Sequence, residues 1–141
     1  MTAAEGRRSA AAASMRLSEH EAFITADLAT IRYLTGFSGS SAVLALCPHG
    51  DVLVSDHRYA EQIDAEVHGV DVVLDRNAIS ALGQTLTVNR VLADRSLAIR
   101  AFAELQKSFA LVEIGSDVVA DMRAVKDADE IDFLYFMGGG A

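Results

Sequence analysis

The chain has 141 residues, 51% of them apolar and 23% charged, so it is long and apolar enough to bury the core of one domain. It carries 12 basic and 20 acidic residues, a formal net charge of −8, and it has no basic block of the kind that neutralises phosphates. We therefore expect a folded domain rather than a disordered chain, with no nucleic acid as a partner.

Cys47 is the only cysteine, which excludes an intrachain disulfide and a Cys-x-x-Cys metal or redox pair. The longest apolar runs, such as 42–47 and 70–74, are far shorter than the ~20 residues that span a bilayer. These features predict a cytoplasmic protein with no membrane partner.

The N-terminal segment pairs two arginines with a run of alanines, a weak imitation of a secretion signal. Alanine is too weakly hydrophobic for that role, and Arg16 and Glu19 interrupt the run. We interpret the segment from Arg7 to Met15 as a helix. Residues 1–6 are expected to be disordered or foreign to the natural chain.

Short β-branched apolar runs alternate with longer helical stretches, a pattern typical of an α/β fold. Between two of the runs, Pro48 and Gly50 favour a tight turn, so the strands on either side should be antiparallel. Several runs are followed by a polar residue. Strands are predicted at 22–26, 43–47, 52–55, 70–74, 90–93 and 111–114.

Apolar residues at helical spacing fill the gaps between the strands. In one such stretch, Tyr59, Ile63 and Val67 recur every fourth residue, with acidic residues on the other side. Helices are predicted at 58–67, 79–86, 97–109, 117–123 and 128–137. The expected fold class is α/β: a three-layer α/β/α sandwich with a mixed sheet of five or six strands.

The last segment, 127–141, is acidic at its start, increasingly apolar from Phe133 to Met137, and ends in three glycines and an alanine. A terminal helix rarely leaves so much apolar surface exposed, so we expect another element to cover it.

No self-contained catalytic constellation stands out. The four histidines, at positions 20, 49, 57 and 68, lack metal-ligand spacing. The segment from Gly36 to Ser40 lacks the lysine of a phosphate-binding loop, and a nucleophile elbow centred on Ser38 would need glycine where Ser40 stands. We interpret this segment as a turn between a helix and a strand.

Three motifs resemble one known family. The run 25–41, TADLATIRYLTGFSGSS, is similar to the early segment of the Xaa-Pro peptidases of the creatinase/prolidase/aminopeptidase P family. The run 52–62, VLVSDHRYAEQ, and the run 122–131, MRAVKDADEI, are similar to its next two motifs, in the same order. Together they extend over nearly the whole chain.

The resemblance implies a ribonuclease-H-like N-terminal domain at 7–126, followed at 127–141 by the start of a linker helix to an absent catalytic domain. In that family the catalytic domain holds the divalent metal, here manganese, cobalt or zinc, so no cofactor, metal ligand or catalytic residue is assigned to this chain. The expected partners are the missing catalytic domain, a second copy in a homodimer, and short peptides as substrates of the full enzyme.

The resemblance also implies which residues face the substrate cleft: Phe37, Ser38, His57, Arg58 and Tyr59. Phe37 would be an apolar wall, and Arg58 and His57 would bind a substrate carboxylate. Three of these residues have a specific structural alternative. Phe37 would also suit the core, and Tyr59 would also pack under the helix that it opens. Arg58 would also pair with Asp56 or cap a helix end.

Three positions depart from the family pattern. Thr30 replaces a common asparagine, Ala42 replaces a common glycine, and His57 stands where a glycine is usual. A histidine would be strained if the backbone there required a positive φ.

The preferred hypothesis is a non-catalytic N-terminal domain of a metal-dependent Xaa-Pro dipeptidase or aminopeptidase, inactive in isolation, that shapes the substrate cleft and the dimer interface. The alternatives are a free-standing α/β binding or interaction module and the N-terminal domain of a creatinase-like amidinohydrolase.

Overall fold

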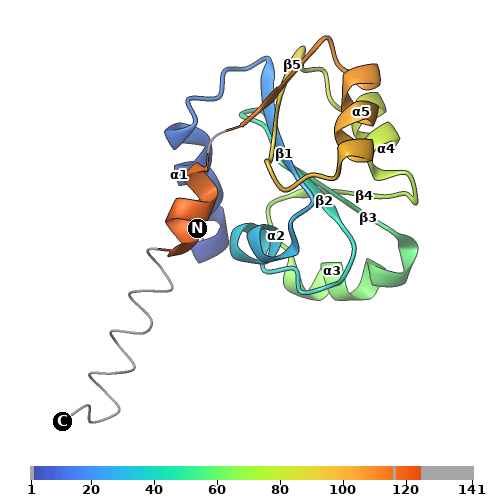
Figure 1. Ribbon diagram of the computed structural model, residues 1–141. Helices are drawn as coiled ribbons and strands as arrows, with labels where there is room; N and C mark the ends of the chain where they lie inside the picture. Colours follow the sequence, from blue (N-terminus) through green and yellow to red (C-terminus); the bar gives the residue numbers. More distant parts are fainter. Residues whose placement is uncertain (1, 116, 125–141) are drawn as a thin grey trace, which may run out of the picture.

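The computed structural model describes residues 2–115 and 117–124 as a six-stranded mixed sheet with helices on both faces (Figure 1). The strand order is β4-β3-β2-β1-β5-β6. The strands are β1 (Glu21–Thr25), β2 (Val43–Leu46), β3 (Val52–Ser55), β4 (Asp71–Leu74), β5 (Arg90–Ala93) and β6 (Leu111–Ile114). The helices are α1 (Ala3–Ser14), α2 (Leu28–Thr35), the 3₁₀ turn η1 (His57–Tyr59), α3 (Ala60–Glu66), α4 (Ala78–Thr85), α5 (Ile99–Ser108) and a last helix at 118–124.

Strand direction follows from the pairing. β2 is antiparallel to both β1 and β3, whereas β1 is parallel to β5, β5 to β6 and β3 to β4. Within the described residues β2 therefore runs opposite to the other five strands. The antiparallel pair β2 and β3, joined by the turn at Pro48 to Asp51, confirms the predicted hairpin.

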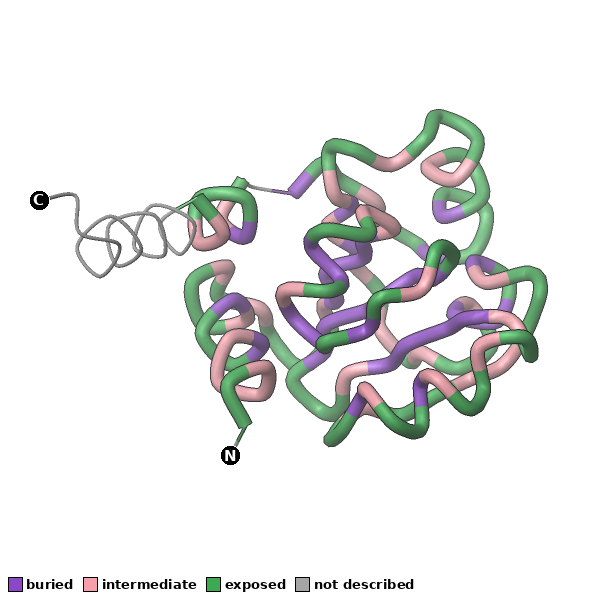
Figure 2. Tube along the Cα trace, turned by 90° about the horizontal axis from the view of Figure 1, so that it is seen from below, coloured by how far each residue is buried: buried purple, intermediate pink, exposed green. Residues whose placement is uncertain are grey.

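Alternation along the strands divides the apolar side chains between two cores. On one face, small and β-branched residues such as Ile24, Val54 and Val91 pack against α4 and α5. On the other face, larger residues such as Phe23 and Leu44 pack against α1, α2, α3 and the helix at 118–124. Figure 2 shows the buried residues concentrated along the strands and the inner sides of the helices. The predicted three-layer α/β/α sandwich is confirmed, with six strands.

The strands lie within one residue of their predicted bounds, because β-branched runs between polar turns give a clear signal. The stretch predicted as a helix at 58–67 divides into η1 and α3, since Asp56 accepts the backbone N–H of Arg58 and caps a tighter first turn. Helix α2 was implied only by the turn that follows it. The prediction of a helix at 128–137 lies outside the described residues.

Helix α1 begins earlier than expected. Residues 3–6, which we expected to be disordered or foreign to the natural chain, form its first turn because the Thr2 hydroxyl accepts the backbone N–H of Glu5 at 3.1 Å, so the first of these two alternatives does not hold for them. Arg8 fastens the helix to the rest of the domain: its guanidinium is buried and donates to the carbonyls of Leu34 (2.8 Å) and His68 (3.0 Å). The same side chain lies 3.3 Å from the carboxylate of Asp51.

Cys47 is buried directly after β2, with a pKa that burial and the nearby charge of Asp51 raise to about 12. The Asp51 carboxylate also accepts the backbone N–H of Cys47 at 3.0 Å. Among the described residues, no helix has both the length and the apolar character needed to cross a membrane.

Candidate functional site

The five candidate residues lie in two segments that meet at one edge of the sheet. Loop 36–42 leads into the start of β2, and η1 follows the end of β3; because these two strands are antiparallel, both points lie at the same edge. The carboxyl ends of β1, β4, β5 and β6 also point to this edge. In open α/β sheets, ligands bind outside the carboxyl ends of the parallel strands.

Loop 36–42 runs along α3 and is fastened to it by side-chain hydrogen bonds. The backbone N–H and hydroxyl of Ser38 donate to the carboxylate of Glu66 at 3.0 and 2.7 Å. The Gln62 amide donates to Ser38 Oγ at 2.9 Å, and the hydroxyls of Ser40 and Tyr59 lie 2.5 Å apart. The hydrogen bonds from Ser38 lower the pKa of Glu66. The loop is therefore held as an ordered strip.

Phe37 lies beneath this strip with only 1% of its surface exposed. Its ring meets that of Tyr59 edge to face, with 5.6 Å between the centroids. A Cβ at Gly39 would lie 2.2 Å from the Phe37 ring, so the turn depends on glycine there. Within this chain Phe37 serves the core. Phe37, Ser38, Ser40, Tyr59, Gln62 and Glu66 form what we call the motif cluster.

Arg58 and His57 lie on the outside of η1, and both are exposed. The guanidinium of Arg58 pairs with Asp56, with Nε 3.0 Å and Nη2 2.9 Å from Oδ2. Hydrogen bonds from Arg58 lower the pKa of Asp56 and raise that of Arg58. Arg58 therefore forms the ion pair with Asp56 that was its structural alternative, and its side chain stays accessible to a ligand.

His57 lines a cavity of about 510 Å³ together with Leu74, Asp75, Arg76 and Asn77. The condition under which a histidine would be strained at this position, a positive φ, is not met. Among described non-glycine residues only Arg16 has a positive φ, and His57 adopts a 3₁₀ conformation that any residue tolerates.

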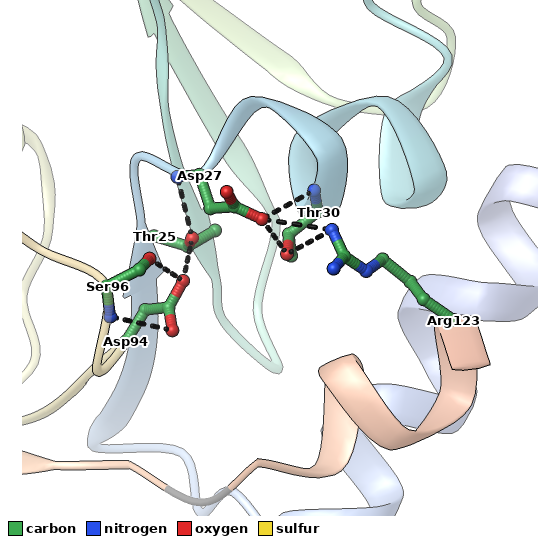
Figure 3. A network of polar contacts seen from close by, with 6 residues as sticks. All are labelled: Thr25, Asp27, Thr30, Asp94, Ser96 and Arg123. Carbon is green, nitrogen blue, oxygen red and sulfur yellow. Dashed lines mark hydrogen bonds and ion pairs between the residues drawn. The ribbon is translucent and has the colours of Figure 1, made fainter.

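A second polar cluster at the same edge was missed by the sequence reasoning (Figure 3). The Asp27 carboxylate accepts the backbone N–H (3.0 Å) and hydroxyl (2.6 Å) of Thr30 at the start of α2, and lies 3.0 Å from Nη1 of Arg123. Burial favours a higher pKa for Asp27, but the hydrogen bonds from Thr30 and the charge of Arg123 outweigh it, and the pKa is lowered. Thr30 is thus the partner of the residue that caps α2.

At the last residue of β1, the Thr25 hydroxyl donates to Asp94 at 2.5 Å, and Ser96 Oγ donates to the same carboxylate at 2.9 Å. Thr25, Asp27, Thr30, Asp94, Ser96 and Arg123 form what we call the crevice cluster. An acidic residue directly after a predicted strand, as at Asp75 and Asp94, was the signal that could have located this edge.

The described residues do not fit a metal ion. Within 2–115 and 117–124, no three histidine, cysteine, aspartate or glutamate side chains are grouped so that they could hold one. Metal chemistry is therefore not assigned to any of these side chains.

Comparison with known proteins gives a consistent result. The model of the creatinase/prolidase N-terminal domain family matches residues 7–125. No curated protein sequence matches the chain. Three of the similar solved structures are an Xaa-Pro aminopeptidase from Streptococcus pyogenes, the N-terminal domain of the cytoplasmic peptidase PepQ from Mycobacterium tuberculosis, and an Xaa-Pro dipeptidase from Bacillus anthracis.

The streptococcal structure has a TM-score of 0.76 and 22% identity, with 84% of this chain and 96% of that chain covered. The mycobacterial domain has a TM-score of 0.70 and 22% identity, covering 86% and 98%. The dipeptidase has a TM-score of 0.77 and 15% identity, covering 85% of this chain but 36% of that chain. At these identities the similarity is one of fold.

Proposed function

The chain belongs to the creatinase/prolidase N-terminal domain family, and we propose that it is the non-catalytic N-terminal domain of a cytoplasmic, metal-dependent Xaa-Pro peptidase. Its role would be to shape the substrate cleft and to contribute to a homodimer interface. The full enzyme would cleave short peptides next to proline.

The observation that carries this proposal is the meeting of two motifs at one edge of the sheet. Loop 36–42 and η1 are separated in sequence by the whole β2–β3 hairpin, yet Ser40 and Tyr59 lie in hydrogen-bond contact. A rigid strip of this kind suits a wall that limits peptide length, because its polar groups are already ordered by α3.

Arg58 is the residue best suited to touch a peptide. Asp56 engages its Nε and Nη2, which fixes the plane of the guanidinium, while the side chain is 73% exposed. An oriented guanidinium binds a carboxylate through charge-assisted hydrogen bonds. His57 next to it adds an exposed imidazole on the rim of the adjoining cavity.

The metal of the proposed reaction, manganese, cobalt or zinc, would be held by a catalytic domain outside this chain. Such an ion lowers the pKa of bound water and polarises a carbonyl. The part played by this chain would be binding and exclusion, through Arg58, His57 and the strip formed by loop 36–42.

The test is to read the gene beyond codon 141 and to assay its full product against Xaa-Pro dipeptides and longer Xaa-Pro peptides, with and without Mn²⁺. We expect metal-dependent cleavage by the full product and none by the 141-residue chain. Cleavage by the short chain after rigorous removal of contaminating peptidases would overturn the proposal.

The same assay separates the alternatives. A reading frame that stops at residue 141 would favour a free-standing binding module, and turnover of creatine by the full product would favour an amidinohydrolase.

In an active full product, Arg58→Ala should raise KM with little change in kcat. The matched control Arg100→Ala alters an exposed arginine on α5 and should leave KM unchanged.

A further inference from the structure

A crevice lies at the edge of the sheet where the connections that follow β1 and β5 go to opposite faces. β1 leads into α2 on one face of the sheet, and its parallel neighbour β5 leads into α5 on the other face. At such a switch point the two connections separate and leave a cavity outside the strand ends, which is where open α/β sheets bind ligands.

The cavity there has a volume of about 250 Å³. Its walls come from the end of β1, the start of α2, the loop after β5 and the helix at 118–124. Figure 3 shows Asp94 and Ser96 on one side and Arg123 on the other, with Asp27 and Thr30 between them. The size suits a small molecule rather than a peptide.

The lining carries charges of both signs. Asp27, Asp94 and Asp117 supply carboxylates, and Arg95 and Arg123 supply guanidinium groups. Arg95 pairs with Asp117 at 2.9 Å, and both side chains are at least half exposed. The charged groups therefore line the cavity as two ion pairs, Arg95 with Asp117 and Arg123 with Asp27, while Asp94 accepts hydrogen bonds from Thr25 and Ser96.

Some of these groups retain hydrogen-bonding capacity. Oδ2 of Asp27 takes all the hydrogen bonds that this carboxylate receives from described residues, which leaves Oδ1 as an acceptor. The guanidinium of Arg123 pairs with this carboxylate through Nη1, but its Nε is buried and has no partner among the described residues. A buried donor without a partner is unusual in a folded protein.

We propose that this crevice binds a free α-amino acid as a zwitterion. The ammonium group would lie toward the carboxylates of Asp94 and Asp27, and the carboxylate toward the guanidinium of Arg123 and that of Arg95. A simple anion would meet three carboxylates and a divalent cation would meet two guanidinium groups, so a ligand of both charges fits best. This proposal does not rest on the peptidase role.

The test is a titration of the 141-residue chain, with arginine Nε–H signals followed by NMR. The probe is L-alanine, and the comparison ligands are N-acetyl-L-alanine, L-alaninamide, inorganic phosphate and Mg²⁺. We expect L-alanine to shift the Arg123 Nε–H signal. The two alanine derivatives, each lacking one charge, should bind at least about tenfold more weakly.

Two variants locate the site. Arg123→Lys keeps the charge but loses the planar guanidinium, and Asp94→Asn removes one carboxylate with almost no change in shape; each should weaken L-alanine binding at least about tenfold. The matched controls, Arg76→Lys and Asp75→Asn, alter the same residue types around the other cavities at this edge and should leave binding unchanged. Circular dichroism shows whether each variant is folded. If Arg123→Lys does not fold, Asp94→Asn alone tests the site.

Every other result overturns the proposal. Equal binding of phosphate or N-acetyl-L-alanine would identify an anion site, and binding of Mg²⁺ alone would identify a cation site. Absence of any shift up to the solubility limit of L-alanine, or an equal loss in the control variants, would show that the crevice is not an amino-acid site.

Discussion

The motif cluster and the crevice cluster lie at the same edge of one sheet, but they are built in opposite ways. In the motif cluster, the buried ring of Phe37 and the half-buried ring of Tyr59 support polar groups that satisfy one another, as Ser38 and Glu66 do. In the crevice cluster, charged groups surround a cavity and one buried donor has no partner among the described residues. The motif cluster thus mainly holds loop 36–42 in place, whereas the unused hydrogen-bonding capacity belongs to Asp27 and Arg123 in the crevice cluster.

The sharpest way to test the first half of this comparison is Phe37→Ala. If Phe37 supports the motif cluster from beneath, its removal should lower the free energy of unfolding by about 3–5 kcal/mol, measured by urea denaturation. Phe37→Leu keeps most of the apolar volume and should cost clearly less. Nearly native stability of the alanine variant would mean that the ring is not part of the core.

Asp27→Ala tests the crevice cluster in the same assay. The substitution removes the cap of α2 and the partner of Arg123, so unfolding should become easier by about 1–2 kcal/mol. Asp64→Ala, at an exposed position in α3, is the control and should leave stability unchanged. An equal effect of the two substitutions would contradict the capping role.

The variant Glu66→Gln tests whether Glu66 holds loop 36–42 in place, through the pH dependence of the free energy of unfolding. The pKa of Glu66 in the folded chain lies below its ordinary value of 4.5, so its contribution is complete above that value and is lost as the pH falls through the folded pKa. The wild type should exceed the variant in stability by under about 1 kcal/mol near neutral pH, and the difference should vanish in acid. A difference that persists or grows in acid would refute the assignment.

Arg58→Ala should have the smallest effect on stability. Arg58 is exposed and its ion pair with Asp56 is screened by water, so the urea midpoint should not change measurably. A large loss of stability would show that Arg58 belongs to the structure of the motif cluster and is not available to a ligand.

Local features of the sequence were enough to predict the sheet. The strands 52–55, 90–93 and 111–114 match their predicted bounds because each is a short apolar run between turn residues. Helix α2 was harder to recognise, since it is only eight residues long and contains two threonines, and its start depends on the side chain of Asp27.

The two clusters also differ in how much of each could be predicted from the sequence. The motif cluster was half found, because Phe37, Ser38 and Tyr59 were candidate residues, while Gln62 was only part of the run 52–62 and Glu66 lies outside every motif. The crevice cluster was missed because Thr25 and Asp94 are 69 residues apart and meet only through the parallel pairing of β1 and β5. Such a contact depends on strand order, which local patterns do not determine.

Because Cys47 is buried, the reactivity of its thiol reports local opening of the domain. A thiol with a pKa of about 12 is almost entirely protonated at neutral pH, and only the thiolate attacks a disulfide reagent. Labelling by such a reagent must therefore wait until the end of β2 separates from its surroundings. The labelling rate would record how often this part of the domain opens, without any engineered probe.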